Sequence, residues 1–282
     1  MQMKKMMILL AALLPVCIAC KTQAQESTLK VMSYNIRYGT ADDGGDHKWE
    51  NRKEAAAAMV LDQRPAVFGV QEALDFQLDY LDENCPGYKY VGVGREDGVH
   101  EGEHMAVFYD TERVELENWG TYWLSETPEV PSYGWDAACK RTATWTLLKD
   151  LQTGKKFYFV NTHLDHVGKE ARRKGLLLLV ERIGQMNPEG YPMLLVGDFN
   201  VHPDNPCLNE LRNLMTDAWQ SAEEADFGTT WHDWGKNTGD TPIDYIFYSG
   251  FSACKSMLRV TQEYKGRSFV SDHYPVTAVL VY

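Results

Sequence analysis

The chain has 282 residues, and its 40 Asp and Glu outnumber its 28 Lys and Arg, which gives a formal net charge of −12. Proteins that hold long nucleic acids through phosphate contacts usually carry a basic face, so this balance argues against long duplex DNA as the partner. It still allows a local basic pocket for a single phosphate group. After residue 24 no repeat or Pro-rich linker divides the chain, so we expect one domain, residues 25–282, that works as a monomer.

The first 24 residues predict an export signal. A basic pair, Lys4-Lys5, precedes an apolar run at 6–19, which is the order of the charged and apolar regions of a secretory signal. The run is shorter than the roughly 20 apolar residues that a transmembrane helix needs. Cleavage after Ala24 would give a periplasmic or secreted protein. Cleavage before one of the two cysteines in this segment would instead leave a lipid anchor in the membrane, and both alternatives stay open.

Short apolar runs in the rest of the chain predict buried strands. These runs lie at 29–36, 66–70, 105–109, 143–148, 156–161, 193–196, 243–248 and 276–281. Helical spacing and turn signals predict helices between them at 51–61, 74–82, 170–186 and 206–218. Strands with interspersed helices indicate an α/β or α+β domain built on buried sheet.

Polar side chains stand where several of these strands begin or end. They are Asn35, Glu72, His163, Asp198, Asn200, Asp244, Asp272 and His273. Packing does not explain them, because charged groups are seldom buried unless they are paired or bind a metal. Strand ends are common places for ligand sites, so the pattern predicts that these residues meet in one site. Carboxylate and amide oxygens suit Mg²⁺, with Mn²⁺ or Ca²⁺ as alternatives.

Two further side chains are candidates for substrate binding. Arg141 would clamp a phosphate, since its planar guanidinium binds oxyanions through two hydrogen bonds. Trp135, which Gly134 and Asp136 flank, would wall a pocket for a base, a sugar or a lipid headgroup. Trp119, in contrast, is expected in the core.

Two other classes of function remain open at this point. His163, Asp165 and His166 lie close enough in sequence to bind zinc, which would make the protein a zinc hydrolase. Their pattern resembles the H-x-H-x-D-H of metallo-β-lactamases, but Asn161 stands in place of the first His. The other alternative is a non-catalytic module that binds a phosphate or a glycan through the aromatic segment 119–135.

Six motifs along the chain carry a resemblance to a known family. They are Ser33-Tyr34-Asn35-Ile36-Arg37, Gln71-Glu72, Asn161-Thr162-His163-Leu164, Gly197-Asp198-Phe199-Asn200, Ile243-Asp244-Tyr245 and Ser271-Asp272-His273-Tyr274-Pro275. From Leu29 to the C-terminus the sequence resembles the endonuclease/exonuclease/phosphatase superfamily, with its deoxyribonuclease-like fold, and looks like an exported bacterial member. The resemblance implies an α/β fold, a four-layer α/β/β/α sandwich in which two mixed β-sheets pack face to face.

The resemblance also implies a role for each polar residue. The expected roles are metal binding, proton handling, positioning of water and phosphate, and substrate contact. Metal binding is expected of Asn35, Glu72 and Asp272, and proton handling of Asp244 and His273. Positioning of water and phosphate is expected of His163, Asp198 and Asn200, and substrate contact of His104. Asp165 is a further substrate-binding candidate, with Arg141 and Trp135.

The implied activity is Mg²⁺-dependent hydrolysis of a phosphoester by in-line attack of water. The expected substrate is a phosphodiester, in a nucleic acid, a phospholipid or a phosphorylated small molecule, because the fold does not decide among these classes. One departure from the family pattern bears on this choice. Arg37 stands where abasic-site endonucleases carry an acidic residue, which argues against a role in DNA repair.

Overall fold

A computed structural model describes residues 26–282 of the chain. The predicted export signal lies outside these residues and stays a prediction. Within the described part, no helix has both the length and the apolar character needed to cross a membrane.

Two mixed β-sheets form the centre of the molecule. The seven-stranded sheet has the order β10-β12-β13-β1-β2-β4-β3, and the six-stranded sheet has the order β5-β6-β7-β8-β11-β9. The strands are β1 Thr28–Asn35, β2 Val67–Gln71, β3 Tyr88–Val91, β4 Val107–Asp110, β5 Val114–Trp123, β6 Thr142–Asp150, β7 Lys156–His163, β8 Met193–Asp198, β9 Thr216–Asp217, β10 Glu224–Ala225, β11 Asp244–Ser249, β12 Ala253–Arg259 and β13 Val276–Val281.

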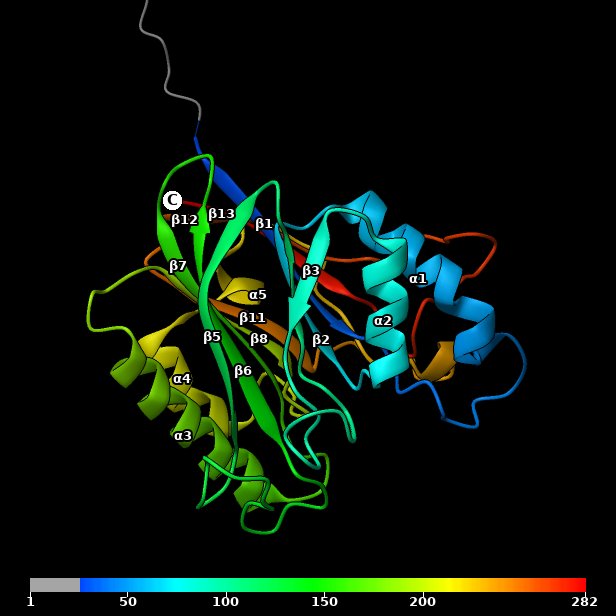
Figure 1. The fold of residues 1–282 in the computed structure, drawn as a ribbon, viewed down its shortest axis with the longest axis horizontal. Coiled ribbons are helices and arrows are strands. Elements are labelled where there is room, and N and C mark those ends of the chain that lie inside the picture. Colours follow the sequence, from blue (N-terminus) through cyan, green and yellow to red (C-terminus); the bar gives the residue numbers. More distant parts are fainter. Residues whose placement is uncertain (1–25) are drawn as a thin grey trace, which may run out of the picture.

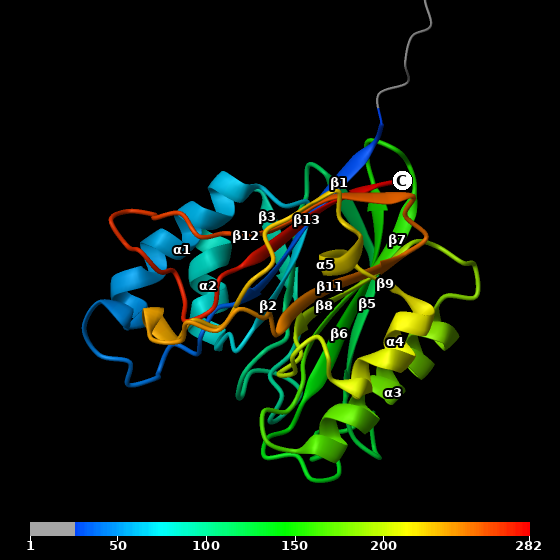
Figure 2. The ribbon, with the colours of Figure 1, turned by 180° about the vertical axis from the view of Figure 1, so that it is seen from behind.

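Helices cover the outer face of each sheet. They are α1 Trp49–Gln63, α2 Asp75–Asn84, α3 Lys169–Met186, α4 Asn209–Leu214 and α5 Ala218–Ser221, with short 3₁₀ helices η1 Gly45–His47, η2 Pro206–Leu208 and η3 Asp233–Gly235. Helices α1 and α2 lie on one side of the molecule and α3 and α4 on the other, with both sheets between them (Figure 1). The view from behind shows the same order of layers (Figure 2). The expected four-layer α/β/β/α sandwich is confirmed.

The alternation of side chains along β1 and β2 explains the layering. Val31 and Val67 belong to the apolar cluster shared by the two sheets and α3. Met32 and Phe68, one position further along each strand, belong to the cluster beneath α1 and α2. Successive side chains of a strand point to opposite faces, so a strand that is apolar at every position is covered on both faces.

All eight predicted strands are present, but three longer strands were missed. These are β3, β5 and β12, which lie at or next to a sheet edge. Strand β5 carries exposed polar residues along its middle, so it has no apolar run that could signal a strand. Trp119, expected in the core, is 39% exposed because it lies on this edge strand.

The single helix predicted at 206–218 is wrong. The segment forms η2 and α4, then turns extended at Met215 (φ −131°, ψ 152°) to make the two-residue strand β9, and α5 follows. Two contacts of Asp217 explain the break. Its backbone pairs with Phe247 of β11, and its side chain accepts a hydrogen bond from the N–H of Trp219 to cap α5. Tertiary pairing thus overrides the local helical pattern.

The strand register brings the predicted polar residues to one edge of the sandwich. Strands β1 and β2 run parallel with Asn35 opposite Gln71, and β7 and β8 run parallel with His163 opposite Asp198. The carboxyl ends of parallel strands meet at one edge of a sheet. Strand β11 runs the other way, so its first residue, Asp244, also lies opposite Asp198.

Asn161 on β7 links the two sheets. Its side-chain Nδ2 donates to the carbonyl oxygens of Val70 (2.8 Å) and Ala106 (2.9 Å), and its Oδ1 accepts from Gln71 Nε2 (2.7 Å). Strand β7 is therefore fastened to the seven-stranded sheet close to the site edge. The amide is a structural group and is fully buried.

We predict that Gly69→Ala destabilises the protein by about 2 kcal/mol, since overpacking and a broken buried hydrogen bond each cost about 1–3 kcal/mol. A Cβ at this position would lie 2.5 Å from Asn161 Cγ. The matched control is Gly184→Ala within α3, where a Cβ has nothing within 4 Å and the change should be neutral or stabilising by up to about 1 kcal/mol. Urea denaturation measures both, and equal midpoints for the two variants would contradict the packing argument.

Candidate active site

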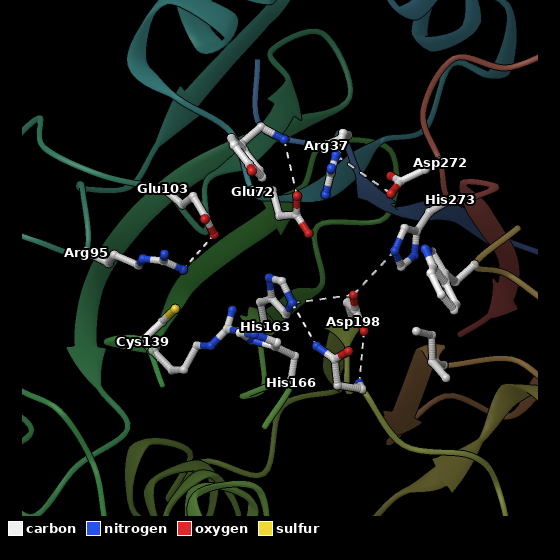
Figure 3. A pocket seen from close by; sticks show the side chains of 15 residues that line it. Arg37, Glu72, Arg95, Glu103, Cys139, His163, His166, Asp198, Asp272 and His273 are labelled. Carbon is white, nitrogen blue, oxygen red and sulfur yellow. Dashed lines mark hydrogen bonds and ion pairs between the residues drawn. The ribbon is translucent and has the colours of Figure 1, made fainter. Parts of the chain in front are cut away.

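A cavity of about 580 Å³ opens at the edge where the polar strand ends meet. Charged and imidazole side chains from both sheets and their loops dominate its wall (Figure 3). The lining residues are Arg37, Tyr38, Glu72, Arg95, Glu103, Cys139, Arg141, His163, His166, Asp198, Asn200, Trp231, Ile243, Asp272 and His273. Seven of the predicted site residues are among them, and Asn35 and Asp244 lie directly behind the wall.

Asp198 is the most connected group of the site. Its Oδ2 accepts a hydrogen bond from Asn35 Nδ2 (3.1 Å) and lies 3.4 Å from His163 Nε2 and 3.7 Å from His273 Nε2. Its Oδ1 accepts from the backbone N–H of Asn200 (2.9 Å). The carboxylate is only 2% exposed, so its orientation is fixed by these neighbours.

His273 and Asp244 form the expected carboxylate–imidazole pair. His273 Nδ1 lies 2.9 Å from Asp244 Oδ2, and both side chains are buried. Burial disfavours the imidazolium, but the carboxylates of Asp244 and Asp198 outweigh it and raise the pKa of His273 to about 10. The ring is therefore held protonated at neutral pH, with Nε2 directed toward Asp198.

Glu72 is held by the last residue of β1 and by the loop that follows it. Its Oε1 accepts from Asn35 Nδ2 (3.0 Å), and its Oε2 accepts from the N–H of Tyr38 (3.2 Å). Three residues that line the pocket have left-handed backbone angles, namely Glu72 (φ 65°), Arg37 (φ 60°) and Asn200 (φ 51°). Such angles cost non-glycine residues about 1–3 kcal/mol each and cluster at functional sites.

Asp272 lies next to Arg37 in the pocket. Burial raises the pKa of Asp272, although His273 opposes the shift. Arg37 approaches it at 3.8 Å while pairing more closely with Asp43 (2.8 Å). The structure thus brings Asp272 and Glu72 to the same wall of the pocket.

A fully buried arginine, Arg52, joins the loop that carries Arg37 to the loop that carries Asp272. Its guanidinium donates to the carbonyl oxygens of Ile36 (2.7 Å), Arg37 (2.8 Å), His47 (3.0 Å) and Val270 (3.0 Å). The loop after β1 and the loop before β13 are therefore joined through one side chain. That junction fixes the site residues of both loops relative to each other.

The donor set fits a divalent cation. Two groups of potential ligand atoms share Asp198, one with Glu72 and His163 and one with Asp244 and His273, and the atoms of each group lie within 4.8 Å of one another. The protonated ring of His273 leaves only the two carboxylates of the second group as possible ligands. Burial, with Asp244 adding to it, raises the pKa of Asp198 to about 7. Clustered buried carboxylates repel one another, and a bound cation would offset that cost.

His163 and Asn200 face the same corner of the pocket. Burial lowers the pKa of His163 well below its usual value, and the charge of Arg141 adds to the effect, so the ring is neutral. Asn200 Nδ2 lies 2.9 Å from His163 Nε2 and 3.0 Å from the carbonyl oxygen of Leu164. With Nε2 accepting from the amide, the ring proton is on Nδ1.

Asp165, predicted as a substrate contact, is not among the lining residues and hydrogen-bonds to the segments behind them. Its oxygens accept hydrogen bonds from the backbone N–H groups of residues 138–139 and 167–168, and Oδ2 also accepts from Arg141 Nε (3.3 Å). Burial opposes ionisation, but the backbone donors prevail and lower the pKa of Asp165 to about 2. Arg141, which also lies 2.9 Å from His166 Nδ1, is thereby oriented along the pocket.

The three residues suggested as zinc ligands do not form one cluster. His163 points into the carboxylate cluster beside Asp198, whereas Asp165 and His166 approach Cys139. The oxygens of Asp165 are already occupied by backbone donors. The predicted set of His163, Asp165 and His166 therefore does not form one metal site, although Asp165, His166 and Cys139 bring their potential ligand atoms within 4.8 Å of one another.

Two predicted substrate contacts lie outside the pocket wall. His104 is 2% exposed, and its Nε2 lies 3.5 Å from Asp75 Oδ1. The residue before it, Glu103, lines the pocket instead. Trp135 packs beneath Lys174, whose Nζ lies 5.6 Å from the ring centroid, and does not line the pocket.

Several lining residues were not predicted as site residues. Tyr38, Arg95, Glu103 and Trp231 stand on loops, where no strand end marks them. Four glycines between residues 92 and 102 signal a tight loop around two of them. Trp231 is placed by an isolated bridge to His273, a long-range pairing that no local pattern reveals.

Comparison with known proteins agrees with this geometry. A family model described as the Endonuclease/Exonuclease/phosphatase family matches residues 32–273. A crystal structure of a member from Bacteroides thetaiotaomicron is 34% identical, covers 92% of this chain and 99% of that chain, and has a TM-score of 0.85. A mannosyl-6-phosphatase of the same organism is 35% identical, covers 90% and 100%, and has a TM-score of 0.85.

A curated relative extends the match beyond bacteria. It is a protein of Acanthamoeba polyphaga mimivirus, 26% identical over 270 residues that cover 89% of this chain and 99% of that protein. The pocket is of the kind that hydrolyses phosphoesters, with clustered acids, paired imidazoles and an arginine. The chain belongs to the endonuclease/exonuclease/phosphatase family, whose members are phosphoester hydrolases.

We predict that Asp165→Asn destabilises the protein at pH 7 by about 2 kcal/mol, at about 1.4 kcal/mol per pKa unit. The folded-state pKa of about 2 lies below the ordinary aspartate pKa of 3.8, so the stabilisation is present above pH 4 and is lost as the pH falls through 2. The stability gap between wild type and variant should narrow over that window in thermal melts. The exposed Asp240→Asn is the control, expected within about 0.5 kcal/mol of wild type, and a constant gap down to pH 2 would refute the assignment.

Proposed function

We propose that this protein is a divalent-metal-dependent phosphomonoesterase that acts on a small phosphorylated sugar. The observation that carries the proposal is one pocket with a carboxylate cluster at one end and a buried arginine, Arg141, beside it. The first feature suits a cation and the second a phosphate. The similarity to a mannosyl-6-phosphatase over nearly the whole chain supports a sugar phosphate as substrate.

Glu72 is the proposed principal metal ligand, with Asn35 and Asp272 beside it. Mg²⁺ is the preferred ion and Mn²⁺ or Ca²⁺ are alternatives, because the donors are hard oxygens. When bound, the ion would neutralise charge that develops on the phosphoryl oxygens. The strained backbone at Glu72 supports a functional role for this carboxylate.

The proposed proton-handling groups are Asp198 and His273. In-line hydrolysis takes a proton from the attacking water and gives one to the alkoxide that leaves when the ester P–O bond breaks. Asp198, a carboxylate whose pKa is raised to about 7, is the proposed acceptor, and solvent in the open pocket would protonate the alkoxide. His273, held cationic by Asp244, keeps that carboxylate in place and balances its charge. Both groups stand at the same end of the pocket (Figure 3).

His163, Asn200 and Arg141 are the proposed donors to the phosphoryl oxygens. His163 Nδ1 is a buried nitrogen without a hydrogen-bond partner among the described residues. A buried donor that lacks a partner is costly, and a substrate oxygen would supply one. Preorganised donors of this kind stabilise the transition state because they need no reorientation during reaction.

We prefer a monoester to the phosphodiester expected from the sequence because one similar structure is a mannosyl-6-phosphatase. The cavity of about 580 Å³ matches the size of a small-molecule site. The net charge of −12 disfavours a long polyanion, for which electrostatic attraction supplies most of the binding. A small phosphorylated substrate satisfies both conditions.

We predict that the protein with Mg²⁺ hydrolyses mannose 6-phosphate and the generic monoester p-nitrophenyl phosphate. Chelation of the metal should abolish turnover, and added Mg²⁺ should restore it. Glu72→Ala should lower kcat by at least about 1000-fold, equivalent to about 4 kcal/mol of transition-state stabilisation. Steady-state kinetics measures each effect.

The control for this experiment is Glu129→Ala, which changes an exposed carboxylate and should keep wild-type rates. Full activity in the presence of chelator, or in Glu72→Ala, would refute the metal assignment. A preference of more than about 100-fold for bis(p-nitrophenyl) phosphate over the monoesters, or about 3 kcal/mol, would restore the diester as the substrate class.

A further inference from the structure

Arg95 and Glu103 enter the pocket at the end that the proposed chemistry does not use. Figure 3 shows both on one side of the cavity, and Asp272 and His273 on the opposite side, with Glu72 between them. Arg95 Nη1 donates to Glu103 Oε2 at 2.6 Å. The two side chains are 11% and 15% exposed, and both line the cavity.

The loop that carries this pair is rigid. Asp97 Oδ1 accepts three backbone hydrogen bonds, from residues 99, 100 and 101, at 2.8 to 3.0 Å. The N–H of Arg95 donates to the carbonyl oxygen of Glu103 (3.1 Å), which sets the two side chains next to each other. Gly94 packs so closely that a Cβ would lie 2.3 Å from the carbonyl oxygen of Glu101.

Neighbouring loops hold the same segment in place without using the pair. Trp123 Nε1 donates to the carbonyl oxygen of Arg95 (2.8 Å), and Lys140 Nζ donates to that of Glu96 (2.9 Å). The loop is therefore anchored through its backbone. These backbone contacts do not involve the charged heads of Arg95 and Glu103, although Arg95 Nε also lies 3.5 Å from Glu96 Oε1.

The Arg95–Glu103 ion pair is largely buried but does not anchor the backbone of its loop, so its burial needs another explanation. Burying two charges costs desolvation energy, and such pairs often stabilise a protein no better than apolar side chains of the same volume. Glu103 uses one carboxylate oxygen for Arg95, and no hydrogen bond to the other is found in the described part of the chain. That oxygen and the remaining guanidinium N–H groups offer an acceptor beside donors, which suits adjacent hydroxyl groups.

The direction of in-line displacement points to the same end of the pocket. The attacking water and the leaving oxygen occupy opposite sides of the phosphorus atom in this reaction. The proposed proton-handling groups, Asp198 and His273, stand at one end of the cavity (Figure 3). The alcohol that leaves the phosphate therefore extends toward the other end, where Arg95 and Glu103 stand.

We propose that the Arg95–Glu103 pair is a leaving-group subsite that binds adjacent hydroxyls of the substrate's sugar. The inference rests on the proposed phosphomonoesterase function and deepens it, because it names the residues that select a polyhydroxylated alcohol. A site built to hydrogen-bond hydroxyls discriminates strongly against analogues that lack them, because its polar groups are then left unpaired. The pair acts in binding and selectivity, not in the chemical step.

The test compares two primary alkyl esters, mannose 6-phosphate and butyl phosphate, of which only the first has hydroxyls beyond the ester. Wild type should favour mannose 6-phosphate in kcat/KM by at least about 30-fold. Glu103→Gln and, separately, Arg95→Gln should each reduce that preference at least tenfold, mainly by raising KM for mannose 6-phosphate. Measuring both esters with wild type and with each variant gives a thermodynamic cycle, which isolates the contact between the residue and the sugar hydroxyls.

The matched control is Glu101→Gln, an exposed carboxylate of the same loop that does not line the cavity, and it should keep the wild-type preference. Thermal melts verify that each variant is folded. An equal fall in kcat/KM for both esters in Glu103→Gln, or no wild-type preference for the sugar ester, would overturn the subsite. Hydrolysis of neither ester, nor of p-nitrophenyl phosphate, would instead refute the phosphomonoesterase proposal itself.

Discussion

The side-chain amide of Asn35 joins two carboxylates that belong to different sheets. Its Nδ2 donates to Glu72 behind β2 and to Asp198 at the end of β8, at 3.0 and 3.1 Å. Acidic groups brought this close repel one another in a buried setting, so they stay together only where donors or cations compensate them. The packing of the two sheets sets the spacing of these acids, and the rest of the site is arranged around them.

The scaffold holds the site residues in a fixed and partly strained conformation. Glu72 keeps a left-handed backbone, and Arg52 fastens the adjoining loops through four carbonyl groups. A site held this firmly needs little rearrangement when a charged transition state forms, which is the condition under which electrostatic stabilisation is largest. The rigid loop with Arg95 applies the same principle to the alcohol side of the substrate.

Strand ends made most of the site predictable from the sequence, because buried strands that stop at Asn35, His163 or Asp198 leave a strong local pattern. Edge strands such as β5 were missed because their middle residues face solvent. Loop residues that line the cavity were missed for a different reason. Trp231 reaches the pocket through its long-range bridge to His273, and Glu103 is placed by the bridge of its neighbour His104 to Ala73, and local sequence carries no record of such contacts.

We infer that Glu72, with Asn35 and Asp272 beside it, holds one divalent cation. Titration of the purified chain with Mn²⁺, followed by electron paramagnetic resonance of the free ion, tests it without any substrate. We expect one bound ion per chain in wild type and in Glu129→Gln. In Glu72→Gln the affinity for Mn²⁺ should be at least about 100-fold weaker, which corresponds to about 3 kcal/mol. Unchanged Mn²⁺ binding in Glu72→Gln, or no binding in wild type, would contradict the account.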